Sequence, residues 1–323
     1  MCPSPVIEVV APSRLHFGMF AFGGHVGRQF GGVGTMVEQP GVRLRVIAAE
    51  RFASGGPLSE RVQRVAQRVA EAWGTPELPH CTIEVLHAAP EHVGLGTGTQ
   101  LALAVAAGLQ AFSGGTPLPP EQLAELAGRG ERSAIGTHGF AHGGLIVEGG
   151  KLPGEAVSPL EERIELPAAW RFVLIWPAGE RGLSGEVERT AFRELPPVDE
   201  QTTARLRQEV ASELLPAARE GSFGRFSESL YRFGHQAGMC FAARQGGPFA
   251  SSKVERLVQA IRELGVCGVG QSSWGPAIFA VLENEVTAAD FVARIHAQLD
   301  PGATLLVTEP NSRGARVTSG SAP

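Results

Sequence analysis

A glycine-rich stretch, VGLGTGTQLALAVAAGL at residues 93–109, places the strongest constraint on how this chain folds. Its glycines alternate with other residues, and an apolar run begins at Leu101. Glycines let the backbone approach a ligand closely, and the free N–H groups and the dipole at a helix start attract negative charge. The stretch therefore predicts a turn that leads into a helix and binds an anion such as phosphate. The residues expected to contact the anion are Gly94, Gly96, Thr97, Gly98, Thr99 and Gln100.

The same spacing is typical of a tight turn whose glycines only permit close packing. Two better-known phosphate loops are excluded. No Lys-Ser or Lys-Thr pair follows the glycines, as a Walker loop requires, and Gly94, Gly96 and Gly98 do not fit the spacing G-x-G-x-x-G. On spacing alone, the anion site and the packing turn both stay open.

Near the N-terminus, the segment 11–41 places Arg14, His16 and Arg28 among several glycines. Pairs of arginines bind phosphate or carboxylate with planar, two-pronged hydrogen bonds. A surface hairpin with solvated arginines explains the segment equally well, and a buried histidine bonded to a backbone group explains His16. We interpret the two arginines as a candidate anion clamp.

Two later loops add further candidates. The loop 179–192 holds Arg181 and Ser184 between glycines, although a flexible connection that leads into a helix has the same pattern. The loop 268–276 is also rich in glycine, and we expect it to close over a ligand. Its candidate residues are Ser272, Ser273 and Trp274.

The sequence does not predict a metal site or a disulfide framework. His138 and His142 are four residues apart, which suits metal binding on a helix, but the glycines between residues 136 and 144 argue against a regular helix. No third ligand is near them. The cysteines are scattered and are expected to be reduced thiols: Cys2, Cys81, Cys240 and Cys267.

Composition narrows the class of protein. The 323 residues carry a net charge of −5 and no basic block, which argues against a general nucleic-acid binder. No apolar run approaches the roughly 20 residues of a membrane helix, and no signal peptide is visible. We therefore expect a cytoplasmic protein that acts on small molecules and has neither a nucleic-acid nor a membrane partner.

Apolar periodicity predicts an α+β chain with two sheet-and-helix halves and a cleft between them. The proline-rich stretch 152–169 suggests a boundary, so we divide the chain into domains 1–160 and 161–323. Ser59 is expected to cap a helix that runs to Trp73, and the tail after Arg316 is expected to be frayed.

Together these loops resemble the GHMP small-molecule kinase superfamily. Its central motif, Pro-x-x-x-Gly-Leu-Gly-Ser-Ser, is similar to PEHVGLGTG at residues 90–98. Its N-terminal Ala-Pro-x-Arg stretch matches residues 11–14, and its C-terminal glycine-rich loop matches 268–276. The resemblance implies two α+β domains, a nucleotide or phosphate site in the cleft, and a left-handed βαβ crossover that runs against the usual rule.

The chain departs from the kinase pattern where catalysis takes place. In the kinases the second serine of the motif helps to hold Mg²⁺, and Gly98 stands in its place here. Many of the kinases also carry a catalytic aspartate seven residues before a Gly-Gly pair. Gly136 occupies that position, and no acid lies between Arg132 and Glu148. The resemblance therefore predicts a retained fold without the kinase base.

One non-kinase branch resembles the chain along nearly its whole length, the β-ribofuranosylaminobenzene 5′-phosphate synthases of methanopterin biosynthesis. The similar segments are SRLH at 13–16, GGVG at 31–34, GLGTGTQ at 94–100, RGLSGE at 181–186, QSSWGP at 271–276 and NSRGA at 311–315.

That family joins 4-aminobenzoate, or 4-hydroxybenzoate in some members, to phosphoribosyl pyrophosphate. A C–C bond forms at the ring carbon that bears the carboxylate, and CO₂ and pyrophosphate leave. Loss of the carboxylate restores aromaticity, which is consistent with the missing base. Such an enzyme must position both partners, stabilise the departing pyrophosphate and exclude water.

The resemblance also implies Mg²⁺ with the pyrophosphate, no organic cofactor and a homodimer; the metal ligands stay unassigned. We expect catalytic roles for Arg14, His16 and Ser272, with His16 near the reacting carbon. The acceptor pocket is expected to be mostly apolar. Substrate binding is assigned to the glycine loop and to Arg28, Arg181, Ser184, Ser273 and Trp274.

Two alternatives stay open. One is an ATP-dependent kinase of the same superfamily with displaced catalytic groups. The other is a non-catalytic relative that binds a phosphorylated metabolite.

Overall fold

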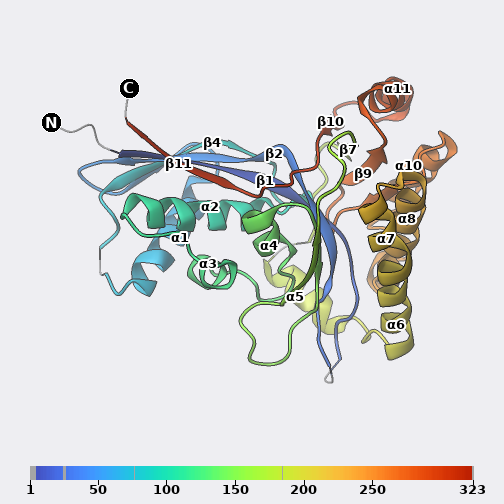
Figure 1. Cartoon of the computed structure of the whole chain (residues 1–323), viewed down its shortest axis with the longest axis horizontal. Helices are drawn as coiled ribbons and strands as arrows, with labels where there is room; N and C mark the ends of the chain where they lie inside the picture. The colour runs from blue at the N-terminus through green and yellow to red at the C-terminus, as the bar shows by residue number, and fades with distance from the viewer. Residues whose placement is uncertain (1–4, 25–26, 76, 184, 322–323) are drawn as a thin grey trace.

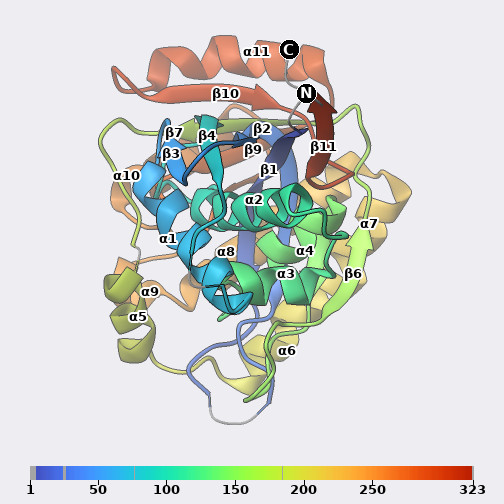
Figure 2. The same cartoon turned by 90° about the vertical axis from the view of Figure 1, so that its left-hand side faces the viewer.

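The computed structural model describes residues 5–24, 27–75, 77–183 and 185–321 (Figure 1). Ser184 and Cys2 lie outside the described residues. The α+β architecture expected from the sequence is confirmed. A large mixed sheet is covered by one set of helices, and a smaller antiparallel sheet carries a second set (Figures 1 and 2).

The larger sheet has seven strands in the order β11-β1-β2-β4-β3, with β5 paired to β2 and β6 paired to β5. The two longest strands, β1 and β2, span two cores: one half of each packs against α1 and α2, and the other half joins the core shared with the smaller sheet. The strands are β1 (Pro5–Met19), β2 (Gly32–Ala48), β3 (Ala53–Gly55), β4 (Cys81–Ala88), β5 (Leu145–Glu148), β6 (Leu160–Ile164) and β11 (Arg316–Ser321). Four helices lie along this sheet: α1 (Ser59–Ala72), α2 (Thr97–Phe112), α3 (Pro120–Ala127) and α4 (Ile135–His142).

Helix α2 lies at the centre of this half of the molecule, packed against β1, β2, α1 and α3. Its sequence, TGTQLALAVAAGLQAF, contains no charged residue, and most of its residues are buried. A helix that is apolar on all sides is stable only when other elements surround it. This packing fixes the position of its N-terminal turn.

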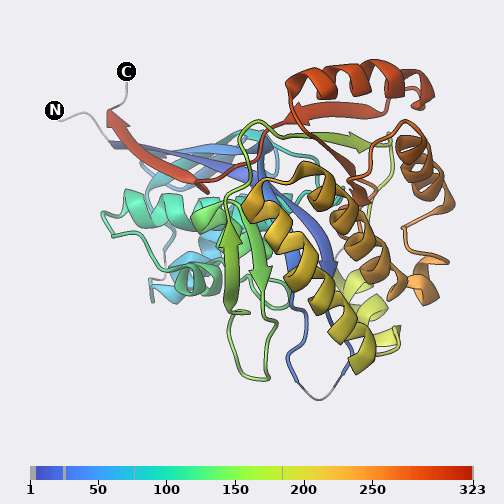
Figure 3. The same ribbon diagram turned by 45° about the vertical axis from the view of Figure 1, so that its right-hand side comes forward.

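The smaller sheet is antiparallel, in the order β10-β7-β9-β8. Helices α10 and α11 pack on one of its faces, while α6 to α8 and part of the larger sheet share a core with the other face (Figure 3). Its elements are β7 (Arg171–Trp176), α5 (Gly185–Glu194), α6 (Glu200–Glu209), a π-helical turn (Val210–Leu214), α7 (Leu215–Glu220), α8 (Phe223–Met239), α9 (Ala242–Gln245), α10 (Ser252–Glu263), β8 (Val269–Gln271), β9 (Ile278–Leu282), α11 (Glu285–Ile295), a 3₁₀ turn (His296–Gln298) and β10 (Thr304–Thr308).

The chain leaves the larger sheet after β6 and returns to it at β11. None of the helices in the described part of the chain is long and apolar enough to cross a membrane.

Three local expectations were wrong. Residues 135–142 form the helix α4 despite their glycines. Gly139 allows Met36 to pack closely against this helix, because a Cβ on Gly139 would lie only 2.2 Å from the Met36 sulfur. The tail after Arg316 forms β11, paired with β1. Ser59 is the first residue of α1 and not its cap; Leu58 precedes the helix with a φ of 63°.

Candidate active site

The glycine loop between β4 and α2 turns as the sequence predicts. Gly94 and Gly96 have φ values of 101° and 72°, which side chains rarely adopt, and α2 begins at Thr97. A Cβ on Gly94 would lie 2.2 Å from the carbonyl oxygen of Ser272, so the glycine lets the C-terminal loop approach. The first turn of α2 contains no acid and no side-chain cap. Its N–H groups and dipole are therefore available to an anion.

An open cleft of about 190 Å³ lies in front of this loop. It brings together residues from six elements or loops that are distant in sequence, and the C-terminal loop joins the glycine loop there. The residues that line it are Arg14, Arg61, His92, Gly94, Leu95, Gly96, Thr97, Gly98, Thr99, Arg129, Leu183, Gly185, Glu188, Ser273, Trp274 and Gly275.

Arg14 reaches the cleft from β1. Its backbone N–H donates to the Leu95 carbonyl at 3.0 Å, which ties the strand to the glycine loop. Its Nη1 is buried and has no hydrogen-bond partner among the described residues. Burial lowers the pKa of Arg14 to about 10, against the opposing charges of Glu188 and Glu148. The guanidinium therefore remains charged at neutral pH and lacks a full set of partners.

Arg61 and Arg129, which the sequence analysis missed, flank Gly98. A Cβ on Gly98 would lie 2.6 Å from Nη1 of Arg61, so the glycine makes room for that guanidinium. Nη2 of Arg129 donates to the Gly98 carbonyl at 2.9 Å. Burial lowers the pKa of Arg129 to about 10, and the nearby charge of Arg61 lowers it further. Gly98 itself does not have a left-handed φ, so the presence of glycine at this position is explained by the space that Arg61 needs and not by backbone freedom.

The three guanidinium groups are compensated only in part. Arg61 forms an ion pair with Glu91, and Glu188 is already paired with Arg132 at 2.9 Å. Like charges gathered at a partly buried site repel one another unless an anion neutralises them. The cleft is therefore suited to a ligand with several negative charges.

Ser272 and Ser273 differ in placement. Ser272 is fully buried: its Oγ accepts from the His16 backbone N–H at 3.0 Å and donates to the Gly94 carbonyl at 2.7 Å. It thus fastens the glycine loop to β1 and does not line the cleft. Ser273, with a φ of 56°, donates its N–H to the His16 carbonyl and lines the cleft beside Trp274.

The imidazole of His16 belongs to a buried polar chain. Ser133 Oγ donates to Glu148 Oε1 at 2.6 Å, so His16 Nε2, at 3.2 Å, donates to Ser133. The Ala134 N–H donates to Glu148 Oε2 at 2.6 Å. Burial and then Arg14 lower the pKa of His16 to about 3, whereas burial raises the pKa of Glu148 to about 7. His16 is therefore neutral, and Glu148 titrates near neutrality.

A second, smaller pocket, of about 50 Å³, adjoins the cleft. No arginine, lysine, aspartate or glutamate lines it among the described residues. It shares Ser273 and Trp274 with the cleft, and Trp274 packs edge-on against Phe192 and Phe241. The residues that line it are His16, Phe17, Gly18, Met19, Gly234, Ala237, Gly238, Phe241, Gln245, Pro248, Phe249, Gln271, Ser273 and Trp274.

His16 lies in the wall of this pocket, but its ring faces the other side of β1. Gly34 pairs with His16, and a Cβ on Gly34 would meet Ile135 of α4. A β-bulge follows, so that Gly18 faces Ala237 of α8 instead. The imidazole is thus directed toward α4, whereas α8 closes the pocket.

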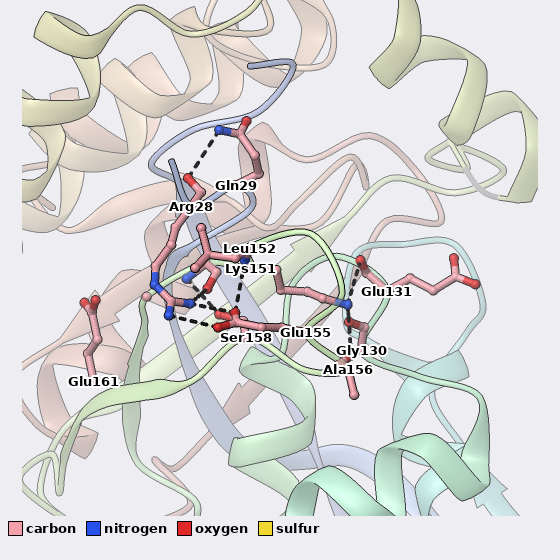
Figure 4. Close-up of polar contacts among 12 residues, drawn as sticks. Arg28, Gln29, Gly130, Glu131, Lys151, Leu152, Glu155, Ala156, Ser158 and Glu161 are labelled. Atoms are coloured by element: carbon pink, nitrogen blue, oxygen red, sulfur yellow. Dashed lines mark hydrogen bonds and ion pairs between the residues drawn. The ribbon is translucent and has the colours of Figure 1, made fainter. Parts of the chain in front are cut away.

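Arg28 does not lie in the cleft. Its guanidinium donates twice to Glu155, at 2.7 and 3.0 Å, and once to the Gly150 carbonyl at 2.8 Å (Figure 4). Arg181 is exposed and does not line the cleft. Ser184 lies outside the described residues.

Two side chains of the glycine stretch form hydrogen bonds within the protein; Thr97 also lines the cleft, whereas Gln100 does not. Thr97 Oγ1 donates to the Pro90 carbonyl at 2.9 Å, and the amide of buried Gln100 donates to the Gly136 carbonyl at 2.9 Å. Thr99 lines the cleft.

His138 and His142 share helix α4, but no metal site forms there. His138 is buried and its Nε2 contacts the Ser158 carbonyl at 2.8 Å, while His142 is exposed.

Comparison with known proteins agrees with this architecture. Residues 60–145 match the GHMP kinases N terminal domain, and residues 214–300 match the GHMP kinases C terminal domain. Among solved structures, homoserine kinase from Cytophaga hutchinsonii superposes with a TM-score of 0.66 at 16% identity and covers 97% of each chain. Mevalonate diphosphate decarboxylase from Staphylococcus aureus gives 0.66 at 16% identity over 98% of each chain.

Two curated relatives are closer in sequence, and both are named beta-ribofuranosylphenol 5′-phosphate synthase. The protein of Methanothermobacter thermautotrophicus is 31% identical, covering 96% of this chain and 98% of its own length. That of Archaeoglobus fulgidus is 31% identical, covering 97% and 99%. With this identity over nearly its whole length and both domains matched, the chain belongs to the β-ribofuranosylphenol 5′-phosphate synthase family, within the GHMP kinase superfamily.

Proposed function

We propose that the chain transfers a phosphoribosyl group from phosphoribosyl pyrophosphate to 4-hydroxybenzoate or 4-aminobenzoate, forming a C–C bond and releasing CO₂ and pyrophosphate, in tetrahydromethanopterin biosynthesis. The relatives' names specify a phenol product, which 4-hydroxybenzoate gives when it loses CO₂. One observation carries the proposal: a cleft with three arginines and a pocket without charged groups meet at Ser273 and Trp274.

In this proposal the donor's pyrophosphate lies at the start of α2, against Arg14, Arg61 and Arg129. Negative charge grows on the pyrophosphate as its bond to the sugar carbon breaks. Guanidinium groups and helix N–H groups that are already in place stabilise this charge without reorganising. The same groups that bind the donor would therefore also help the leaving group depart.

The uncharged pocket suits the aromatic acceptor. A carboxylate held by a paired arginine is stabilised as an anion, and that stabilisation raises the barrier to losing CO₂. A pocket without arginine avoids this penalty, and its aromatic wall excludes water from the sugar cation. Ser273 and Trp274, shared by both sites, are our candidates for orienting the reacting ring carbon. This replaces the role expected for the His16 ring.

The residues around the cleft do not form a magnesium site held by the protein. No three His, Cys, Asp or Glu side chains gather as metal ligands in the described part of the chain. Gly98 supplies no hydroxyl, and Glu91 and Glu188 are both paired with arginines. We retain Mg²⁺ only as an ion that the pyrophosphate would bring with it, and no step depends on it.

Labelled substrate tests the proposal. The protein is incubated with phosphoribosyl pyrophosphate and carboxyl-labelled 4-hydroxybenzoate or 4-aminobenzoate, with Mg²⁺ in one arm and EDTA in another. We expect labelled CO₂ and pyrophosphate in equal amounts without ATP. ATP consumption without CO₂ would favour the kinase alternative, and binding without turnover of any pair would favour the non-catalytic one.

A matched pair of glycine variants on α8 tests the acceptor pocket. A Cβ on Gly234 meets only the Phe17 carbonyl oxygen, at 3.6 Å, so a larger side chain there extends into the pocket. A Cβ on Gly224 meets nothing within 4 Å. We expect Gly234→Leu to lose turnover while it still binds pyrophosphate, and Gly224→Leu to behave like the wild type. Equal turnover in both variants would place the acceptor elsewhere.

A further inference from the structure

One side-chain amide oxygen in the apolar pocket has no hydrogen-bond partner among the described residues. Gln245 ends α9, where its backbone N–H donates to the Phe241 carbonyl at 3.0 Å, and the chain then turns at Gly246 with a φ of 81°. Its side-chain oxygen, Oε1, is buried and accepts no hydrogen bond from the described residues. A buried carbonyl oxygen without a donor is destabilising, and a ligand that brings an N–H or O–H removes the penalty.

The other glutamine of the pocket differs in this respect. Gln271 Oε1 accepts from the Ala250 N–H at 2.6 Å, and its Nε2 donates to the Ser273 carbonyl at 2.7 Å. Both ends of that amide are used to hold the C-terminal loop. Gln245 is therefore the glutamine of this pocket whose side-chain oxygen is available to accept a hydrogen bond from a polar group on an aromatic ligand.

We propose that Gln245 accepts a hydrogen bond from the hydroxyl or amino group that lies opposite the carboxylate on the acceptor ring, an inference that rests on the function proposed above. The attacked ring carbon must lie where the pocket meets the cleft, at Ser273 and Trp274. The opposite substituent then points into the part of the pocket that the cleft does not share, and Gln245 belongs to that part of the wall.

This contact would also assist the reaction. A π electron pair of the ring forms the bond from the carboxylate-bearing carbon to the sugar carbon, while the sugar–oxygen bond breaks and its pair leaves with pyrophosphate. The substituent's lone pair delocalises into the ring, so its O–H or N–H becomes more positive. Loss of CO₂ returns an electron pair to the ring, and the proton stays on the substituent. A carbonyl oxygen that accepts this proton in a hydrogen bond is most stabilising at the positive stage.

An acceptor series tests the proposal. The wild type and Gln245→Leu are compared with 4-hydroxybenzoate, 4-aminobenzoate and unsubstituted benzoate, by calorimetric binding in the presence of pyrophosphate and by kcat/KM with the donor. We expect the wild type to prefer the substituted acids over benzoate by about tenfold or more in binding, as one buried hydrogen bond allows. Gln245→Leu should lose most of that preference and leave benzoate binding unchanged.

Controls separate the possible failures. Gln259→Leu, on the exposed face of α10, makes the same substitution away from the pocket and should keep the wild-type preference. Gln245→Met, closer in shape, replaces the leucine variant if that protein does not fold. A Gln245 variant that keeps the preference while the enzyme still turns over overturns this inference alone. A wild type that binds none of the benzoates overturns the proposed function as well.

Discussion

Arg14 and Arg28 both lie among glycines in the first thirty residues, yet their surroundings are opposite. Arg28 forms a two-pronged ion pair with Glu155, and the two side chains are 35% and 34% exposed. Arg14 is half-buried, and its buried terminal nitrogen Nη1 has no partner among the described residues. Its neighbour Glu148 is 0% exposed and is bonded to Ser133 and Ala134 instead.

The difference shows where a charge is available to a ligand. A half-exposed arginine whose donors are paired has little to gain from a further anion, and such pairs add little to stability. A guanidinium with a buried, unpaired donor carries a desolvation penalty that an arriving anion offsets. Proximity to glycine was therefore a poor guide, and the partners of each arginine are a better one. Four experiments test this difference between the two arginines and their surroundings.

The first experiment concerns the buried acid Glu148, beside Arg14. The pKa of Glu148 is raised from 4.5 to about 7, so the folded protein holds this proton more tightly than the unfolded chain. The free energy of unfolding should then fall by about 3 kcal/mol as pH rises from 4.5 to about 7.5, and level off above it. In Glu148→Gln this fall should be absent.

Urea denaturation across that pH range measures the fall. Glu84→Gln, at an exposed position of β4, controls for the loss of one carboxylate. Parallel pH profiles for the wild type and Glu148→Gln would show that the buried acid does not titrate in this range.

Next in size is the loss of donor binding when Arg14 is removed. Arg14→Ala should weaken pyrophosphate binding by about 1.5–3 kcal/mol, the range for hydrogen bonds to charged groups. Arg14→Lys keeps the charge without the planar fork and should recover only part of the affinity. Calorimetry with pyrophosphate measures both variants. Wild-type affinity in Arg14→Ala would assign the arginine to structure alone.

A smaller effect is expected at Gly98. In Gly98→Ser the new Cβ would lie 2.6 Å from Arg61 Nη1 and displace that guanidinium, so donor affinity should drop by about 1 kcal/mol. Because both changes act on one contact, Gly98→Ser combined with Arg61→Ala should be little weaker than Arg61→Ala alone. Gly224→Ser, in open space, is the control. Strictly additive losses would argue against the contact.

The smallest effect is expected for Arg28→Ala. It breaks a half-exposed ion pair that does not line the cleft, so donor affinity should stay within about twofold of the wild type and the melting temperature should change little. The same calorimetric titration checks this. A tenfold loss would return Arg28 to the donor site and remove the contrast with Arg14.

Features that depend on neighbouring residues were predictable from the sequence. The turn at Gly94 and Gly96 and the start of α2 follow from local glycine spacing and an apolar run. The identity of Arg14 as a cleft residue came from its motif. The positions of Arg61 and Arg129 did not, because α1 and the end of α3 meet at Gly98 only through tertiary packing. The one sequence signal for this contact was Gly98, which stands where the kinase motif has serine, and it did not identify Arg61 as the neighbour.

The other misses have the same origin. In the sequence, Glu148 only marked the end of a stretch without acids. Its hydrogen bond with Ser133, which in turn contacts His16, depends on the tertiary fold. Helix α4 was missed because glycine generally disfavours a helix. At Gly139 the absence of a side chain leaves the space that the Met36 side chain occupies. Apolar patterning predicts layers, whereas the partner of a buried polar group depends on contacts between distant segments.

The pairing of β11 with β1 has a consequence for synthesis of the protein. Residues 316–321 bond to residues 5–10 of the strand that carries Arg14 and His16. Until they emerge from the ribosome, that part of β1 is an open edge, able to pair with another nascent chain. A product that stops before Arg316 keeps this edge exposed. Translation that ends early would therefore leave the long β1, in place of the short and mostly polar β11, at the edge of the sheet, even though every residue of the cleft is present.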